Sequence, residues 1–224
     1  MSRRATTRTA RWWVACTLTG LLFGLSTASA QDPISPPPGK ESVPIPTDIL
    51  VRVVARGAMV LGNEVGGARV IITDVATGEI LAAGLQVGEA GDQNQIMRTP
   101  MTPHEPRYSS TLSAAFRTTL ELIRPTPVEI TVTGPLHYPA ATQRASKTVL
   151  LIPGRDLTSD GIVIELNGFI VQIEQPLPGD LLIAQEDVLL RASVRTLSGA
   201  LVRPHSDWDS RKIHIYGEVL VDGR

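Results

Sequence analysis

From position 49 onward, hydrophobic residues form short segments rich in valine, isoleucine and threonine, and glycine and proline separate these segments. In residues 68–74 and 127–133, apolar and polar side chains alternate, which is typical of a strand with one buried face. No segment carries the sustained 3.6-residue apolar repeat of an amphipathic helix. We therefore expect an all-β fold, an antiparallel β-sandwich. The expected strands are residues 49–56, 68–74, 79–84, 112–123, 127–133, 145–151, 161–166, 169–174, 187–196 and 211–221.

Turn residues support these strands and indicate how the chain is divided. Gly78 follows Thr77 between two strand patterns, and Asn167-Gly168 separates two apolar segments, so we expect a hairpin at each place. Prolines 176 and 178 interrupt the strand pattern and predict a domain boundary. The expected domains are a β-sandwich over residues 47–174 and a second β module, immunoglobulin-like, over residues 181–224.

The second module is short, because an immunoglobulin-like domain takes about 100 residues. Its last expected strand, residues 211–221, is followed by the turn dipeptide Asp222-Gly223 and by no further strand. Two interpretations are open: the sequence stops before the domain is complete, or a partner supplies the missing strand. In the second case, the strand edge near residues 211–221 binds a protein partner or a second copy of the chain.

The first 30 residues have the three-part pattern of a secretory signal peptide. Four arginines precede an apolar stretch at residues 12–25, and Ala28 and Ala30 form a small-residue cleavage site. An uncleaved membrane anchor is the alternative. Residues 31–46 follow with six of the 17 prolines and are expected to form a stiff linker. We expect an exported protein of the periplasm, the cell surface or the extracellular space that meets the membrane only during export.

Charge and cysteine content exclude several functions. The chain has 21 basic and 22 acidic side chains, and this balance does not favour nucleic-acid binding. The mean hydropathy of +0.08 excludes a protein with many membrane spans. The single cysteine, Cys16, lies in the signal peptide, so the exported chain is expected to have no disulfide, no thiolate nucleophile and no cysteine metal ligand.

Two stretches resemble known β modules. In residues 67–82, a glycine-initiated strand, an acidic residue, the Thr77-Gly78 turn and a second strand resemble the start of carboxypeptidase-regulatory-like, transthyretin-like modules. Residues 178–194 are similar to the opening of a bacterial immunoglobulin-like domain. Both families consist mostly of non-catalytic additions to secreted or cell-surface proteins, so the resemblance implies a binding role.

The longest stretch without a strand pattern, residues 86–110, contains the first candidate site. Met97, Met101 and His104 lie in it, and thioether and imidazole ligands together suit copper. The alternative is that these are ordinary loop residues, with three nearby prolines constraining the chain.

The second candidate site is the polar cluster His205, Asp207 and Asp209. Carboxylates two residues apart can hold calcium, and His205 beside Ser206 is a minimal pattern for a hydrolase. No nucleophile-elbow motif accompanies this cluster. The alternative is that Trp208 covers the end of the core while the flanking acids stay in water.

These features lead to three hypotheses. The first is an exported, non-catalytic β-sandwich protein that binds or scaffolds through its loops or an open sheet edge, with no cofactor. The second is a copper-handling accessory protein that uses the loop at residues 97–104. The third is a secreted hydrolase, for which no catalytic residue can be assigned beyond the polar cluster.

Overall fold

The computed structural model describes residues 43–100, 102, 105–108, 112–183 and 187–220. The expected signal peptide and residues 31–42 of the expected linker lie outside this part of the chain. Within it, no helix has both the length and the apolar character needed to cross a membrane.

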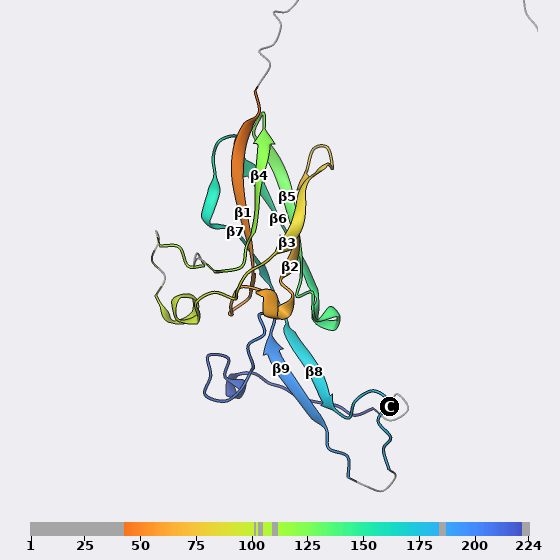
Figure 1. The fold of residues 1–224 in the computed structure, drawn as a ribbon. Helices are drawn as coiled ribbons and strands as arrows, with labels where there is room; N and C mark the ends of the chain where they lie inside the picture. Colours follow the sequence, from red (N-terminus) through yellow and green to blue (C-terminus); the bar gives the residue numbers. More distant parts are fainter. Residues whose placement is uncertain (1–42, 101, 103–104, 109–111, 184–186, 221–224) are drawn as a thin grey trace, which may run out of the picture. The chain divides into compact units, whose positions relative to one another are not determined.

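The described chain is an all-β sandwich, as the sequence predicts (Figure 1). One sheet has the strand order β4-β1-β7, the other has the order β3-β2-β5-β6, and a separate two-stranded sheet pairs β8 with β9. The strands are β1 (Ile45–Ala55), β2 (Ala68–Asp74), β3 (Ile80–Gln86), β4 (Phe116–Leu122), β5 (Thr126–Gly134), β6 (Gln143–Leu151), β7 (Leu157–Leu166), β8 (Phe169–Gln175) and β9 (Arg191–Thr196).

Alternating residues form the core between the two larger sheets. In β2, Ala68, Val70 and Ile72 are buried while Arg69 is exposed, and β5 follows the same period with Val128 and Ile130. These side chains belong to one cluster with inward-facing residues of β1, β4 and β7. The alternation seen in the sequence therefore marks the buried face of this sheet.

The expected hairpin at Thr77-Gly78 is confirmed, since β2 and β3 pair antiparallel around it. Gly78 has a φ of +75°, a left-handed conformation that glycine adopts without a side-chain clash, and its N–H donates to the carbonyl of Asp74. The carboxylate of Asp74 accepts hydrogen bonds from the backbone N–H groups of Ala76 and Thr77. Both the turn glycine and the acid before it fix this hairpin.

One pairing differs from the expected antiparallel arrangement. β1 pairs antiparallel with β4 but parallel with β7, with a register shift between Ile49 and Val51. In β7, Ser159 and Gly161 both have positive φ, at 54° and 70°. This bulge in β7 changes the register of the pairing. Parallel strands are not joined by a short turn, so no turn signal in the sequence could have predicted that β1 and β7 pair.

The expected hairpin at Asn167-Gly168 is wrong. β7 before it pairs with β1, and β8 after it pairs with β9. The dipeptide is therefore a link between strands of two different sheets.

The proline-rich segment after Gln175, where we expect a domain boundary, lies between the paired strands β8 and β9. The division into domains at that point stays a prediction.

The expected strand at residues 211–221 is also wrong over the described residues. A short 3-10 helix (η4, Ser210–Lys212) begins the segment, and residues 213–220 have no strand. An alternating pattern forms a strand only where a neighbouring strand offers ladder hydrogen bonds, and no described strand pairs with this segment. Val221 lies outside the described residues.

A second, smaller core covers the outer face of β1. Val54 packs there with Met59, Val60, Ile96 and Ala114. Ile96 comes from η2 (Asn94–Arg98), a short π-helix inside the long stretch without a strand pattern. This loop, residues 87–115, thus packs against the sandwich through apolar residues such as Ile96 and Ala114.

Candidate functional site

The two regions singled out in the sequence meet on the surface of the molecule. The carboxylate of Asp207 accepts hydrogen bonds from Arg98 Nη2 at 3.1 Å and from Arg98 Nε at 3.4 Å, and it also accepts one from the Gln93 amide. Arg98 is held from its other side by Asn94 Oδ1 at 3.1 Å. The ion pair joins the loop at residues 87–115 to the chain after β9.

Asp207 belongs to a tight turn at residues 203–208. The N–H of Arg203 donates to the carbonyl of Trp208 at 3.2 Å, and the Ser206 hydroxyl donates to the carbonyl of Arg203 at 2.9 Å. His205, at φ +59°, has the left-handed conformation that the turn requires. Trp208 Nε1 donates to the carbonyl of Gly57 at 3.1 Å, and its indole packs against both apolar cores. Trp208 thus packs against the core as expected, but the expectation that both flanking acids stay in water is wrong, because Asp209 is buried.

Between this turn and η2 lies a groove of about 490 Å³, which we call the loop–turn groove. It combines two arginines and a histidine with an apolar surface from Leu201 and Trp208. Its lining residues are Gln93, Arg98, Ala200, Leu201, Arg203, His205, Ser206, Asp207 and Trp208.

The acids of the expected calcium cluster have separate partners. Asp207 bonds to Arg98, whereas the buried Asp209 carboxylate accepts from Arg211 Nε at 3.0 Å and Nη2 at 2.5 Å and from the Arg211 N–H. Hydrogen bonds from these arginines hold the pKa of each carboxyl below its ordinary value of 3.8. Over the described ranges, no three histidine, cysteine or acidic side chains gather in a way that could hold a metal ion.

The geometry around Ser206 does not assemble a nucleophile. Its hydroxyl donates to the carbonyl of Arg203, three positions earlier in the same turn, and not to His205. A serine nucleophile needs its hydroxyl oriented toward a general base. The hydrolase hypothesis therefore gains no support from this turn.

Of the expected copper ligands, only Met97 lies in the described part of the chain. Its side chain is half-buried against the smaller apolar core. Met101 and His104 lie outside the described residues, so the copper hypothesis stays a prediction.

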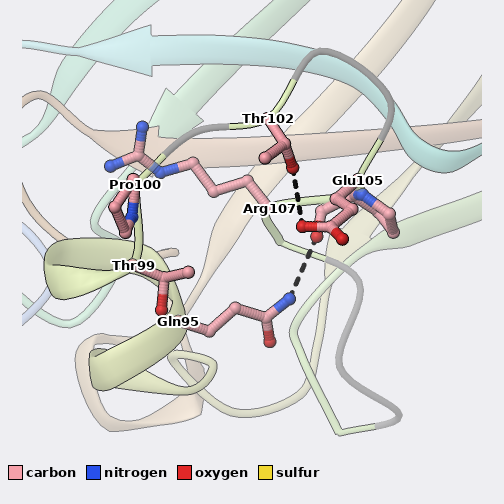
Figure 2. Close-up of a pocket in the computed structure, with 7 residues that line it drawn as sticks. Gln95, Thr99, Pro100, Thr102, Glu105 and Arg107 are labelled. Carbon is pink, nitrogen blue, oxygen red and sulfur yellow. Dashed lines mark hydrogen bonds between the residues drawn. The ribbon is translucent and has the colours of Figure 1, made fainter.

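A smaller pocket of about 230 Å³ lies beside η2 (Figure 2). Figure 2 shows Gln95 directed from η2 toward the facing loop, where its amide donates to the Pro106 carbonyl at 3.0 Å. Across the pocket, the Thr102 hydroxyl donates to Glu105 at 2.6 Å, and Arg107 donates to the carbonyl of Ile96 through Nε at 3.0 Å. These polar side chains are satisfied by the loop itself, so the pocket is a by-product of loop packing.

The two-stranded sheet of β8 and β9, which we call the ribbon, has an exposed apolar face. Val171 is 61% exposed, Ile173 is 67% exposed and Phe169 is 45% exposed, all on one side of β8. They lie opposite Val194, Ala192 and Thr196 of β9 in the pairing register. The intervening β8 residue Ile170 is buried in the main core. We call the exposed side the ribbon face.

Sequence reasoning missed Gln93, Arg98 and Arg203 as groove residues. Arg98 and Asp207 lie 109 positions apart, and nothing local to either indicates the contact. Residues 169–174 were expected as a strand, but the sequence gave no sign that one face of this strand would be left uncovered.

Comparisons with known proteins find no match: no family model, no curated protein and no solved structure corresponds to the chain.

Proposed function

We propose that the chain is an exported, non-catalytic β-sandwich protein that acts by binding and scaffolding through its ribbon face. One observation carries the proposal, namely the exposed apolar surface of β8 at Phe169, Val171 and Ile173. Complete burial of one such side chain contributes about 1.5–3 kcal/mol to stability or association. A contiguous exposed surface of this kind marks an interaction site in a soluble protein.

The architecture of the ribbon supports the same proposal. A two-stranded sheet is marginally stable in water unless its apolar face is covered. No described element of the chain covers Val171 or Ile173. Further large apolar side chains are exposed in the β8–β9 connection and in the C-terminal segment. They are Leu177, Leu181, Leu182, Ile183, Val188, Leu189, Leu190, Ile215, Tyr216, Val219 and Leu220.

The partner we propose is a second copy of the chain. The ribbon face carries no charged side chain, so two copies related by a twofold axis place apolar residues against apolar residues without repulsion. Face-to-face packing of two ribbons gives each the second layer that a β-sandwich requires. The arginine and glutamate residues of the ribbon, such as Glu174 and Arg195, lie on its opposite side or at its ends and form the polar rim.

Light scattering on the exported chain tests this proposal. We expect a dimer that dissociates on dilution, and a Val171→Lys variant that is monomeric because the lysine charge would be buried in the contact. Gln172→Lys is the matched control, since Gln172 is exposed on the opposite side of the same strand.

Three results would contradict the proposal. One is a wild-type chain that is monomeric at all concentrations. Another is a Gln172→Lys variant that dissociates as readily as Val171→Lys. The third is a dimer that Val171→Lys leaves intact. Circular dichroism of each variant confirms that the sandwich is folded before its size is interpreted.

A further inference from the structure

We propose that the loop–turn groove binds an organic carboxylate with a small apolar body. The groove joins a polar side, with the cationic Arg203 beside His205, to an apolar side, from Leu201 and Trp208. Its volume of about 490 Å³ lies in the range of small-ligand sites, which bury an apolar ligand body and fix a few polar groups.

The charges in the groove leave one arginine available for a ligand. Arg98 is neutralised by Asp207, and the hydrogen bonds from Arg98 and Gln93 occupy that carboxylate. Arg203 is exposed, and its guanidinium makes no hydrogen bond or ion pair with any residue in the described part of the chain. An arginine presents a planar pair of N–H donors that matches a carboxylate. Because Arg98 and Asp207 neutralise each other, Arg203 is the groove residue that attracts the carboxylate of a ligand.

The turn holds Arg203 in place before a ligand arrives. The backbone N–H of Arg203 is bonded to Trp208, and its carbonyl accepts from both Ser206 and the N–H of Ser210. Trp208 is anchored in turn to Gly57. A backbone fixed at these points loses little conformational freedom on binding, which favours affinity for a small ligand.

The apolar side of the groove selects among anions. Leu201 is 41% exposed, and Trp208 is half-buried beside it. An inorganic anion gains nothing from this surface, whereas a ligand with a branched aliphatic group covers it. The ligand class is therefore a carboxylate with an aliphatic body, such as an acyl amino acid.

N-acetyl-leucine and its uncharged counterpart N-acetyl-leucinamide are the probes. Trp12, Trp13 and Trp208 are the three tryptophans of the sequence, so after removal of the signal peptide the fluorescence reports on Trp208 alone. We expect a saturable fluorescence change with N-acetyl-leucine, weakened by added salt, and an affinity at least about tenfold lower for the amide.

Arg203→Gln tests the residue that carries the proposal, with Arg124→Gln as the control. Arg124 is an exposed arginine in the turn between β4 and β5, so its removal changes the net charge by the same amount. We expect Arg203→Gln to weaken binding of N-acetyl-leucine about tenfold or more and Arg124→Gln to leave it unchanged.

Each other outcome overturns the proposal. Absence of binding by both probes removes the site, and equal binding of acid and amide shows an apolar contact without carboxylate recognition. Equal affinities of wild type and Arg203→Gln remove the role of the arginine. Val171→Lys on the ribbon face leaves the affinity unchanged if this site is independent of self-association.

Discussion

The side chain of Gln86 links the two sheets through the core. It is 1% exposed, its Oε1 accepts from the N–H of Val53 at 2.6 Å, and its Nε2 donates to the carbonyls of Val53 at 2.9 Å and Leu61 at 2.8 Å. A buried backbone group that loses its partner costs about 1–3 kcal/mol. This single residue therefore bonds three buried backbone groups, and one of them, the Val53 carbonyl, also accepts from the N–H of Leu61.

Replacement of Gln86 by leucine is expected to lower the free energy of unfolding by about 2–4 kcal/mol, because the Val53 N–H and the Leu61 carbonyl lose this partner and the Val53 carbonyl keeps only the N–H of Leu61. Urea denaturation followed by circular dichroism measures the loss. Gln143→Leu, at an exposed position of β6, is the control and is expected to change stability little. Similar losses for the two variants would show that the Gln86 hydrogen bonds contribute no net stability.

Alanine variants at two glycines with positive φ distinguish the cost of backbone strain from the cost of a steric clash. Gly67, at φ +59°, would place a Cβ 2.2 Å from the carbonyl oxygen of Gln86, whereas Gly78, at φ +75°, has open space around it. We expect Gly78→Ala to cost about 1–2 kcal/mol and Gly67→Ala about 3 kcal/mol or more. Chemical denaturation of both variants gives the comparison, and equal costs would contradict it.

The carboxyls of Asp207 and Asp209 make the stability of the fold change with pH in the acid range. Hydrogen bonds from Arg98 and Arg211, respectively, lower the folded-state pKa of each below 3.8. A carboxyl with a lowered pKa stabilises the fold above its unfolded-state pKa, and this contribution disappears as pH falls through the folded-state value.

We therefore expect Asp209→Asn to destabilise the protein at pH 6 and the difference from wild type to shrink progressively below pH 3.8. Urea denaturation at a series of pH values measures it. Asp187→Asn removes an exposed carboxylate that makes no hydrogen bond to any described residue and is the control. A difference that stays constant down to the lowest pH would contradict the ion-pair origin.

Among the elements, β7 attaches the long loop to the sandwich. The carboxylate of Asp160 accepts from the N–H groups of Arg107 and Tyr108, both at 2.7 Å. Next to it, the carbonyl of Ser159 accepts from the buried Arg52 at 2.6 Å. Burial lowers the pKa of Arg52, and the charge of Asp160 opposes this effect. The β7 bulge thus holds the loop and partly compensates a buried cation.

Removal of this carboxylate by Asp160→Ala is expected to cost about 1.5–3 kcal/mol and to speed hydrogen exchange at the amides of Arg107 and Tyr108. Asp156→Ala is the control, because Asp156 accepts one hydrogen bond, from the exposed N–H of Asp48. Unchanged exchange at Arg107 and Tyr108 would show that apolar packing alone holds the loop.

The elements also show what the sequence could predict. The β2 bounds and the Thr77-Gly78 hairpin were predicted because their alternation and turn chemistry are local. The Asn167-Gly168 hairpin and the strand at residues 211–221 were wrong, because a turn or an alternating pattern does not specify the pairing partner. The loop–turn groove could not be predicted for a similar reason, since Arg98 and Asp207 are far apart in the sequence and come together only through the fold.

For the whole molecule, export is the premise of the proposed function. Removal of residues 1–30 takes away four of the 21 basic side chains and none of the 22 acidic ones, which leaves a formal net charge of −5. Cys16 leaves with them. We expect mass spectrometry of the exported protein to give a chain that begins at Gln31 and does not react with a thiol reagent after unfolding. A thiol-reactive product would show that the signal peptide is retained.

The parallel pairing of β1 with β7 also determines the order in which the chain can fold. Val51 pairs with Ile162, so the central strand of its sheet cannot complete its ladder until most of the polypeptide is present. During synthesis the amino-terminal end emerges first, and β1 must wait with one edge open until β7 follows. The hairpin of β2 and β3 closes early, whereas β1 stays open to pairing with other chains. A chaperone would therefore act during the interval between the emergence of β1 and the arrival of β7.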